Sequence, residues 1–158
     1  MRRIAVIMAA ATTACLLTSE PIDQLDLSLA LSADRVLADS GLRISVSAVN
    51  RGTGAVHLET NCPLGLDLVP PANANEELSL PDVFCRSESR SVEIAPGDSA
   101  TLEYHLDFRP QAHASRITRW PAGRYEVTGY LSNHGQVVRR TAPAGFDLVC
   151  SDPTWAEC

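Results

Sequence analysis

The sequence predicts an all-β protein, a single antiparallel immunoglobulin-like β-sandwich of seven to nine strands. Two observations indicate this fold. Apolar and polar residues alternate with a period of two in one segment after another, and short runs rich in Gly, Pro, Asn and Asp separate those segments. Because successive side chains of a strand point to opposite faces, each alternating segment offers one face to a core and one to solvent.

Four segments carry the alternation most clearly, and five shorter segments fill the gaps between them. Turn sequences such as Pro96-Gly97-Asp98 separate them. Two stretches lack a strand period: 70–81, for which we expect an exposed loop, and the polar stretch 109–119. The clear segments are Leu25–Leu31, Leu42–Ala48, Leu102–Phe108 and Tyr125–Leu131, and the shorter ones are Ala55–Glu59, Leu64–Val69, Ser91–Ile94, Gln136–Arg139 and Phe146–Cys150.

The first residues have the pattern of a secretory signal peptide. Arg2 and Arg3 precede an uncharged apolar run from Ile4 to about Ala14, and polar residues return at Thr18. This run is shorter than the roughly 20 residues of a membrane-spanning helix. We therefore expect a signal peptide over residues 1–19, a single domain over 20–158, and a location in the cell envelope, the periplasm or the medium.

Two modes of signal cleavage fit the sequence. Thr12-Thr13-Ala14-Cys15 resembles a bacterial lipobox, in which a small residue precedes the cysteine that receives lipid. That interpretation predicts cleavage after Ala14 and lipidation of Cys15, so the protein would meet the membrane only through a lipid anchor. Cleavage near Ala14 or Ser19 by an ordinary signal peptidase is the alternative.

The other four cysteines are expected to form disulfides. They are Cys62, Cys85, Cys150 and Cys158, an even number for an oxidising compartment. The spacing has no CxxC pair and no nearby His pair, which argues against zinc. Of the three connectivities we favour Cys62–Cys85 and Cys150–Cys158, because each pair brackets one polar stretch and the second pair closes the C-terminal tail.

The charge distribution suggests a candidate binding surface. The formal net charge is −6 and becomes −8 once Arg2 and Arg3 are removed with the signal peptide, which argues against nucleic acid as the partner. Residues 109–140 nevertheless hold six arginines and one acid, Glu126. These arginines form a patch for an acidic macromolecule, or they face different directions and pair with acids locally. The candidate partner-binding residues are Arg109, Arg116, Arg119, Trp120, Arg124, Arg139 and Arg140.

Trp120 has two interpretations, an exposed contact residue of the patch or a residue that caps the core. The sequence has no GxSxG elbow, HExxH helix or Gly-rich phosphate loop. We therefore name no catalytic, metal-binding or cofactor-binding residue and expect no cofactor. An enzyme with an unrecognised site remains the third functional interpretation.

Three stretches together resemble a known family. They are Leu42-Arg-Ile-Ser-Val-Ser-Ala-Val-Asn50-Arg-Gly52-Thr-Gly-Ala-Val56-His-Leu58, Ile94-Ala-Pro96-Gly97-Asp98-Ser-Ala-Thr-Leu102, and Pro121-Ala-Gly123-Arg-Tyr125-Glu-Val127-Thr-Gly129-Tyr130-Leu131. Their order resembles the BsuPI-type domain, which is named for an intracellular bacterial proteinase inhibitor, over roughly residues 25–149. The resemblance implies an immunoglobulin-like fold and points to proteinase inhibition as one activity. It transfers no inhibitory residue.

The functional hypothesis from the sequence is an exported, non-enzymatic envelope protein that binds another macromolecule, a protein or an anionic polysaccharide. The alternative is a secreted or periplasmic proteinase inhibitor. An exposed, rigid loop able to enter a protease cleft would favour the inhibitor, and 62–85 and 109–120 are the two candidate loops.

We predict that Cys15 becomes the first residue of the mature protein and carries lipid. The mature protein should then partition into the detergent phase, and its N-terminal peptide should carry the mass of the attached acyl chains, because a multiply acylated cysteine anchors durably. Mass spectrometry of that peptide checks the prediction. An unmodified N-terminus at Glu20 would show plain cleavage instead.

Overall fold

The computed structural model describes residues 21–59, 63–72, 91–108, 111–113, 116–118 and 120–151, with the backbone alone for Pro21, 111–113 and 116–118. Within these ranges the chain is all β apart from one short 3₁₀ helix, η1 (Pro21–Gln24). Among the described residues, no helix has the length and apolar character needed to cross a bilayer. The strands are β1 (Leu25–Leu31), β2 (Arg35–Leu37), β3 (Leu42–Asn50), β4 (Val56–Glu59), β5 (Leu64–Val69), β6 (Ser91–Ile94), β7 (Ser99–Leu106), β8 (Gln111–His113), β9 (Arg116–Thr118), β10 (Gly123–Asn133), β11 (Gln136–Arg140) and β12 (Ala144–Val149).

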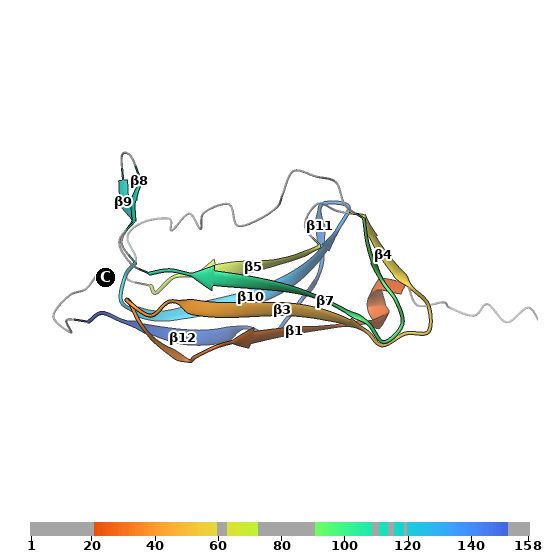
Figure 1. The fold of residues 1–158 in the computed structure, drawn as a ribbon, viewed down its shortest axis with the longest axis horizontal. Helices are drawn as coiled ribbons and strands as arrows, with labels where there is room; N and C mark the ends of the chain where they lie inside the picture. The colour runs from red at the N-terminus through yellow and green to blue at the C-terminus, as the bar shows by residue number, and fades with distance from the viewer. Residues whose placement is uncertain are drawn as a thin grey trace, which may run out of the picture.

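Two sheets form the sandwich (Figure 1). The three-stranded sheet has the order β1-β3-β7, and every pairing in it is antiparallel. The five-stranded sheet is built around β10, which pairs with β5 along one edge and with β12 and β11 along the other. Strand β2 adds to β12 in the parallel direction. Two small ribbons, β4–β6 and β8–β9, complete the fold.

The core lies between the two sheets and follows the alternation in the sequence. Strand β3 buries Leu42, Ile44, Val46 and Ala48 from one sheet. Strand β10 meets them from the other sheet with Tyr125, Val127 and Leu131, and β1, β3 and β7 contact strands of the five-stranded sheet. The period-two pattern therefore sorts these side chains between the core and the solvent.

The two sheets also meet along their edges. At one edge the Tyr104 hydroxyl of β7 donates to the Leu64 carbonyl of β5, at 3.4 Å. At another, the Arg139 guanidinium of β11 donates to the Leu25 carbonyl of β1 and, at 3.2 Å, to the carbonyl of Asp23. Side chains of one sheet therefore satisfy backbone groups beside the other.

A buried asparagine fixes the corner where the chain leaves the three-stranded sheet. Strands β3 and β7 pair within that sheet, and their continuations β4 and β6 pair as a separate ribbon. Asn50, fully buried at the bend, donates from Nδ2 to the carbonyls of Gly54 and Ile94, both at 2.8 Å. Its Oδ1 accepts from the Gly52 amide at 2.9 Å. A single side chain thus satisfies three backbone groups of the two turns.

The strand prediction is confirmed in its main elements. All nine predicted segments are strands, and Leu25–Leu31, Leu64–Val69 and Ser91–Ile94 have the predicted bounds. The structure adds three strands of three residues each, β2, β8 and β9. The expectation that 109–119 contains no strand was wrong, because strands this short show too few alternations to reveal a period.

Several sequence predictions lie outside the described residues. They concern the signal peptide over 1–19, lipidation of Cys15, most of the loop 70–81, and the pairing of Cys62 with Cys85. Cys150 is buried in the core, with 5% of its surface exposed, and is disulfide-bonded. The other cysteines are outside the described ranges, so both favoured pairings remain predictions.

We predict that Asn50→Ala lowers the free energy of unfolding by about 3 kcal/mol, because the substitution leaves up to three backbone groups of a buried corner without partners. Urea denaturation measures the change. Ser47→Ala is the matched control, since the Ser47 hydroxyl bonds to Thr101 Oγ1 on the exposed face of the same strand pair, and it should cost less than about 1 kcal/mol. Equal losses in the two variants would contradict the role assigned to Asn50.

Candidate functional site

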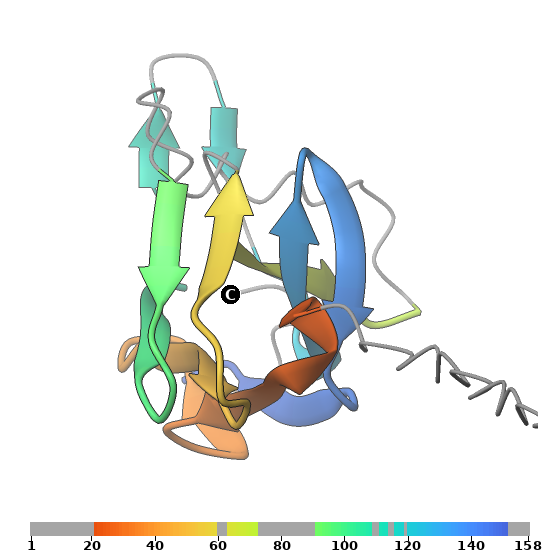
Figure 2. The same ribbon diagram turned by 90° about the vertical axis from the view of Figure 1, so that its right-hand side faces the viewer.

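The β8–β9 hairpin is the part of the described chain that projects from the sandwich. It stands clear of both sheets in two perpendicular views (Figures 1 and 2). Its register pairs Gln111 with Thr118, Ala112 with Ile117, and His113 with Arg116. Residues paired across two strands share a face, and neighbours along a strand lie on opposite faces. By backbone register, Gln111, His113, Arg116 and Thr118 therefore hold positions on one side of the ribbon, and Ala112 and Ile117 hold positions on the other.

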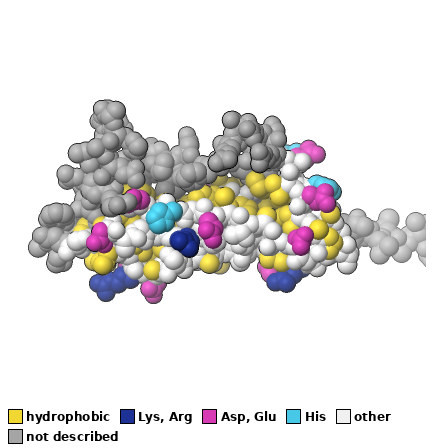
Figure 3. Space-filling model, in the orientation of Figure 1, with side chains coloured by type: hydrophobic (Ala, Val, Ile, Leu, Met, Phe, Trp, Pro, Cys, Tyr) yellow, Lys and Arg dark blue, Asp and Glu magenta, His cyan; other side chains and the backbone are white. Residues whose placement is uncertain are grey.

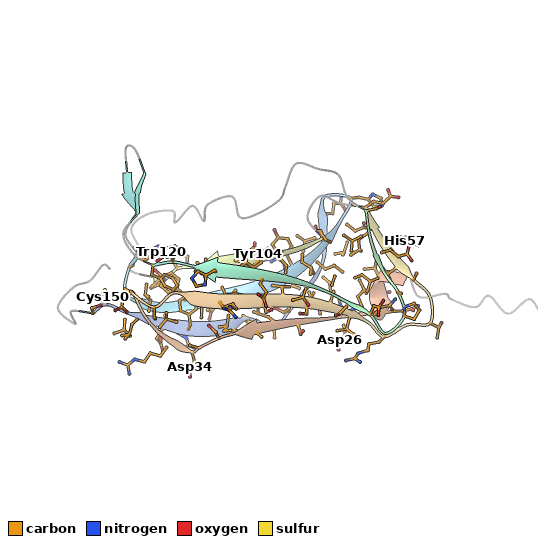
Figure 4. The ribbon with its side chains drawn as sticks, in the orientation of Figure 1. Asp26, Asp34, His57, Tyr104, Trp120 and Cys150 are labelled. Carbon is orange, nitrogen blue, oxygen red and sulfur yellow. The ribbon has the colours of Figure 1, made fainter. Side chains whose placement is uncertain are left out.

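Core aromatic residues hold both ends of the hairpin segment. Phe108 is fully buried just before it and Trp120 is 7% exposed just after it. Their ring centroids lie 5.1 Å apart in an edge-to-face arrangement. Phe108 also contacts the ring of Phe146, at 5.7 Å, and Trp120 contacts that of Tyr125, at 6.1 Å. The segment therefore leaves and re-enters the fold through one aromatic cluster, whose Trp120 is labelled in Figure 4.

Tyr125 closes this cluster and fixes the backbone beside it. Its ring stacks on Phe146 with centroids 5.1 Å apart, and its hydroxyl donates to the Pro121 carbonyl at 2.7 Å. A tyrosine near the start of a strand that bonds back to upstream backbone is the tyrosine corner of immunoglobulin-like sandwiches. Burial raises the pKa of the Tyr125 hydroxyl well above its ordinary value.

Trp120 belongs to the core. Its small exposed fraction and its contacts with Phe108 and Tyr125 correct its inclusion among exposed partner-binding residues and favour the core-capping interpretation. A large apolar ring that follows a polar, arginine-rich stretch looks like a contact residue in the sequence. It lies inward because its ring packs against those of Phe108 and Tyr125.

The three candidate arginines whose side chains the structure describes have partners within the chain. Arg124 of β10 forms an ion pair with Asp147 of β12 at 3.1 Å. Arg140 of β11 forms an ion pair with Asp67 of β5 and lies 5.9 Å from the centroid of a tyrosine ring. Arg139 donates to backbone carbonyls at the start of β1. The alternative of local pairing therefore describes Arg124 and Arg140, whereas Arg139 bonds to backbone carbonyls. A partner-binding role for these arginines stays a prediction.

Arg124 and Arg139 lie far from each other along the sheet. Arg139 pairs in register with Leu131, seven residues along β10 from Arg124, a separation of about 23 Å at 3.3 Å per residue. Strand β11 ends at Arg140, so β12 takes its place beside the first half of β10. Arg109, Arg119 and the side chain of Arg116 lie outside what the structure describes.

The visible surface of the sandwich has both signs of charge. On the face shown in Figure 3, arginines and acids are interspersed rather than gathered by sign. His57 and His134 lie on this protein's surface opposite Glu93 and Glu59, at 3.5 Å and 3.8 Å. Within the described ranges, His, Cys, Asp and Glu side chains form no group of three or more that could hold a metal ion.

No protein-family model matches the chain, and no curated protein has significant similarity to it. Among solved structures, a β-glucosidase from Erythrobacter marinus aligns over 79% of this chain and 16% of its own length, at 14% identity and a TM-score of 0.45. The β-glucosidase of Listeria innocua aligns at 15% identity over 78% of this chain and 16% of its own, with a TM-score of 0.42.

A β-glucosidase from Bifidobacterium adolescentis aligns at 16% identity and a TM-score of 0.40, over 77% of this chain and 17% of its own. The chain thus spans about a sixth of the length of these enzymes. Similarity at this level carries no argument about activity.

We predict that alkaline pH destabilises the fold through Tyr104 and Tyr125. Burial raises the pKa of Tyr104 to about 12, with a smaller contribution from Tyr130, and burial raises that of Tyr125 as well. Above about pH 10 the unfolded chain releases protons that the folded chain retains, so the free energy of unfolding falls as pH rises.

The double variant Tyr104→Phe, Tyr125→Phe should show a flatter decline between pH 10 and 12 in urea denaturation series. At neutral pH it should lose about 1 kcal/mol for each hydrogen bond removed. The same slope in the parent and the variant would contradict this prediction.

Proposed function

We propose that this protein is an exported, non-enzymatic binding module of the cell envelope, an immunoglobulin-like domain that holds another macromolecule through the β8–β9 hairpin. One observation carries the proposal: a short polar hairpin projects from the sandwich while Phe108 and Trp120, at its base, pack in the core. A projection held at both ends loses less conformational entropy on binding than a free loop would.

Charge supports the same element. From Arg109 to Arg119 the sequence has three arginines and no acid, whereas the whole chain carries a net charge of −6. A local positive segment on an acidic protein favours an acidic partner, either a protein or an anionic polysaccharide. The arginines of β10 and β11 are engaged within the fold, so we assign the contact to the hairpin.

The resemblance to BsuPI-type domains supports a second candidate, proteinase inhibition outside the cytoplasm. The observation that favours it is again the hairpin, since a projection fixed at both ends has the shape that a protease cleft accepts. We propose export through the signal peptide over 1–19, a lipid anchor at Cys15, and disulfides Cys62–Cys85 and Cys150–Cys158.

The mature protein, used as bait on a detergent-solubilised envelope fraction, tests the binding function. The matched control replaces residues 109–119 with a Gly-Ser linker and keeps Phe108 and Trp120, so its melting temperature should stay within a few degrees. We expect one component to bind the parent and not the linker variant. A bait that retains no component above background would contradict a binding function.

The inhibitor candidate has its own readout. Inhibition of a serine proteinase at submicromolar protein concentration, lost in the linker variant, would favour it over a structural binding role. Proteinase activity unchanged across serine, cysteine and metalloproteinase representatives would remove it.

A further inference from the structure

The outward side of the five-stranded sheet is polar along its central strand. On β10, Arg124, Glu126, Thr128 and Tyr130 alternate with buried core residues, so they occupy positions on the side away from the core. Each of them has cross-strand neighbours on β5, β11 or β12 that share this side. We call the surface formed by these four residues and their outward neighbours on β5, β11, β12 and β2 the β10 face.

Planar side chains lie down on the β10 face instead of standing out from it. A Cβ atom on Gly65 of β5 would overlap Cζ and the hydroxyl oxygen of Tyr130, its partner in the register. The tyrosine ring therefore occupies the space that the glycine leaves over the backbone of β5. At Gly145 of β12 a Cβ atom would lie 2.6 Å from Nη2 of Arg124, so the guanidinium group covers that glycine in the same way.

Two ion pairs extend this surface. Arg140 reaches from β11 across β10 to Asp67 of β5, and its guanidinium carbon lies 5.9 Å from the centroid of the Tyr130 ring. Arg124 pairs with Asp147 at 3.1 Å. The four paired side chains keep between 49% and 58% of their surface exposed. A guanidinium has several N–H donors and a carboxylate several acceptor sites, so both pairs can bond to a ligand while they stay paired.

The charges of the β10 face balance. Among the described strand residues at outward positions of this sheet, arginines and acids are three each: Arg35, Arg124 and Arg140, and Asp67, Glu126 and Asp147. The whole chain, in contrast, has a net charge of −6. A balanced face gives a charged partner no long-range attraction, so an uncharged molecule is the electrostatic complement of this surface.

We propose that the β10 face binds a neutral oligosaccharide. The C–H side of a sugar ring packs on an aromatic ring, and neighbouring sugar hydroxyls donate to a carboxylate and accept from a guanidinium group. Tyr130 and the Arg140–Asp67 pair offer all three contacts side by side. Arg124 lies six residues along β10, about 20 Å at 3.3 Å per residue, which gives a chain of several sugars a second contact.

The ion pairs favour a sugar over a protein as the occupant. A protein that covered the face would remove two ion pairs from water, which costs several kcal/mol for each buried ion. Sugar hydroxyls replace the hydrogen bonds of water and leave the site wet. The β10 face contains no residue of 109–119, so this sugar site does not depend on the binding function of the hairpin.

Calorimetric titration of the mature protein with cellohexaose, maltohexaose and N-acetylchitohexaose tests the ligand class, and hexagalacturonate is the anionic comparison. We expect one of the neutral sugars to bind, with an affinity that changes less than about twofold between about 50 and about 500 mM NaCl, because no net charge is neutralised. No binding of any neutral hexasaccharide, or tighter binding of hexagalacturonate, would overturn the neutral-sugar site.

The position of the site is tested by substitution. Tyr130→Leu and Asp67→Asn should each weaken sugar binding about fivefold or more, because each removes one of the paired contacts. Asp26→Asn is the matched control, since Asp26 is also an exposed partner of an arginine, Arg51 at 3.7 Å, but lies on the other sheet. It should change the affinity less than about twofold. Equal losses from Asp67→Asn and Asp26→Asn would overturn the β10 face as the site.

Two further variants separate this site from other causes of lost binding. Tyr130→Phe keeps the ring and should lose less affinity than Tyr130→Leu, whereas equal losses would contradict packing of the sugar on the ring. The linker variant of 109–119 should bind the sugar as tightly as the parent. A linker variant that loses the envelope component and keeps the sugar would leave both sites standing, and one that loses the sugar would overturn the placement on β10.

Discussion

Phe108, Trp120, Tyr125 and Phe146 come from separate parts of the chain, and their rings meet at the end of the sandwich from which the hairpin projects. This contact joins the residues after β7, the start of β10 and the middle of β12, so both sheets share it. Without it, the segment 109–119 would be a long connection between two strands with nothing to define where it leaves the core. Aromatic burial therefore serves both the core and the placement of the β8–β9 hairpin.

The opposite end of the molecule is organised by polar contacts. There the side-chain amide of Asn50 holds two turns together. The backbone carbonyl of Glu59 accepts from the backbone amide of His134, and the backbone amide of Glu59 donates to Asn133 Oδ1. An apolar side chain at position 50 would have filled the space and left backbone groups unsatisfied. A buried amide specifies the bend as well as stabilising it, because only one arrangement of the turns satisfies all of its donors and acceptors.

How much the sequence revealed depended on whether a feature was local. The alternation in Leu42–Ala48 predicted both the strand and the face that it buries, and the turn residues Pro96-Gly97-Asp98 predicted where the neighbouring strand β7 begins. The main strands and the core could therefore be predicted. Strand β2 could not, since three residues that pair in parallel with β12 leave no local pattern. The partners of Arg124 and Arg140 were equally hidden, because Asp147 and Asp67 reach them only through the register of a sheet.

The ion pairs of Arg124 and Arg140 reduce the positive potential that these two side chains present to solvent. An exposed arginine beside a carboxylate contributes little to stability, usually less than about 1 kcal/mol, and its field is cancelled within a short distance. The arginines on β10 and β11 are in this situation or bonded to backbone, so an approaching acidic surface meets a nearly balanced sheet face. The hairpin segment has no acid of its own in the sequence, and it projects into solvent. Within the part of the chain that the structure describes, the aromatic cluster therefore holds away from the sheets a hairpin whose segment carries positive charge with no acid of its own.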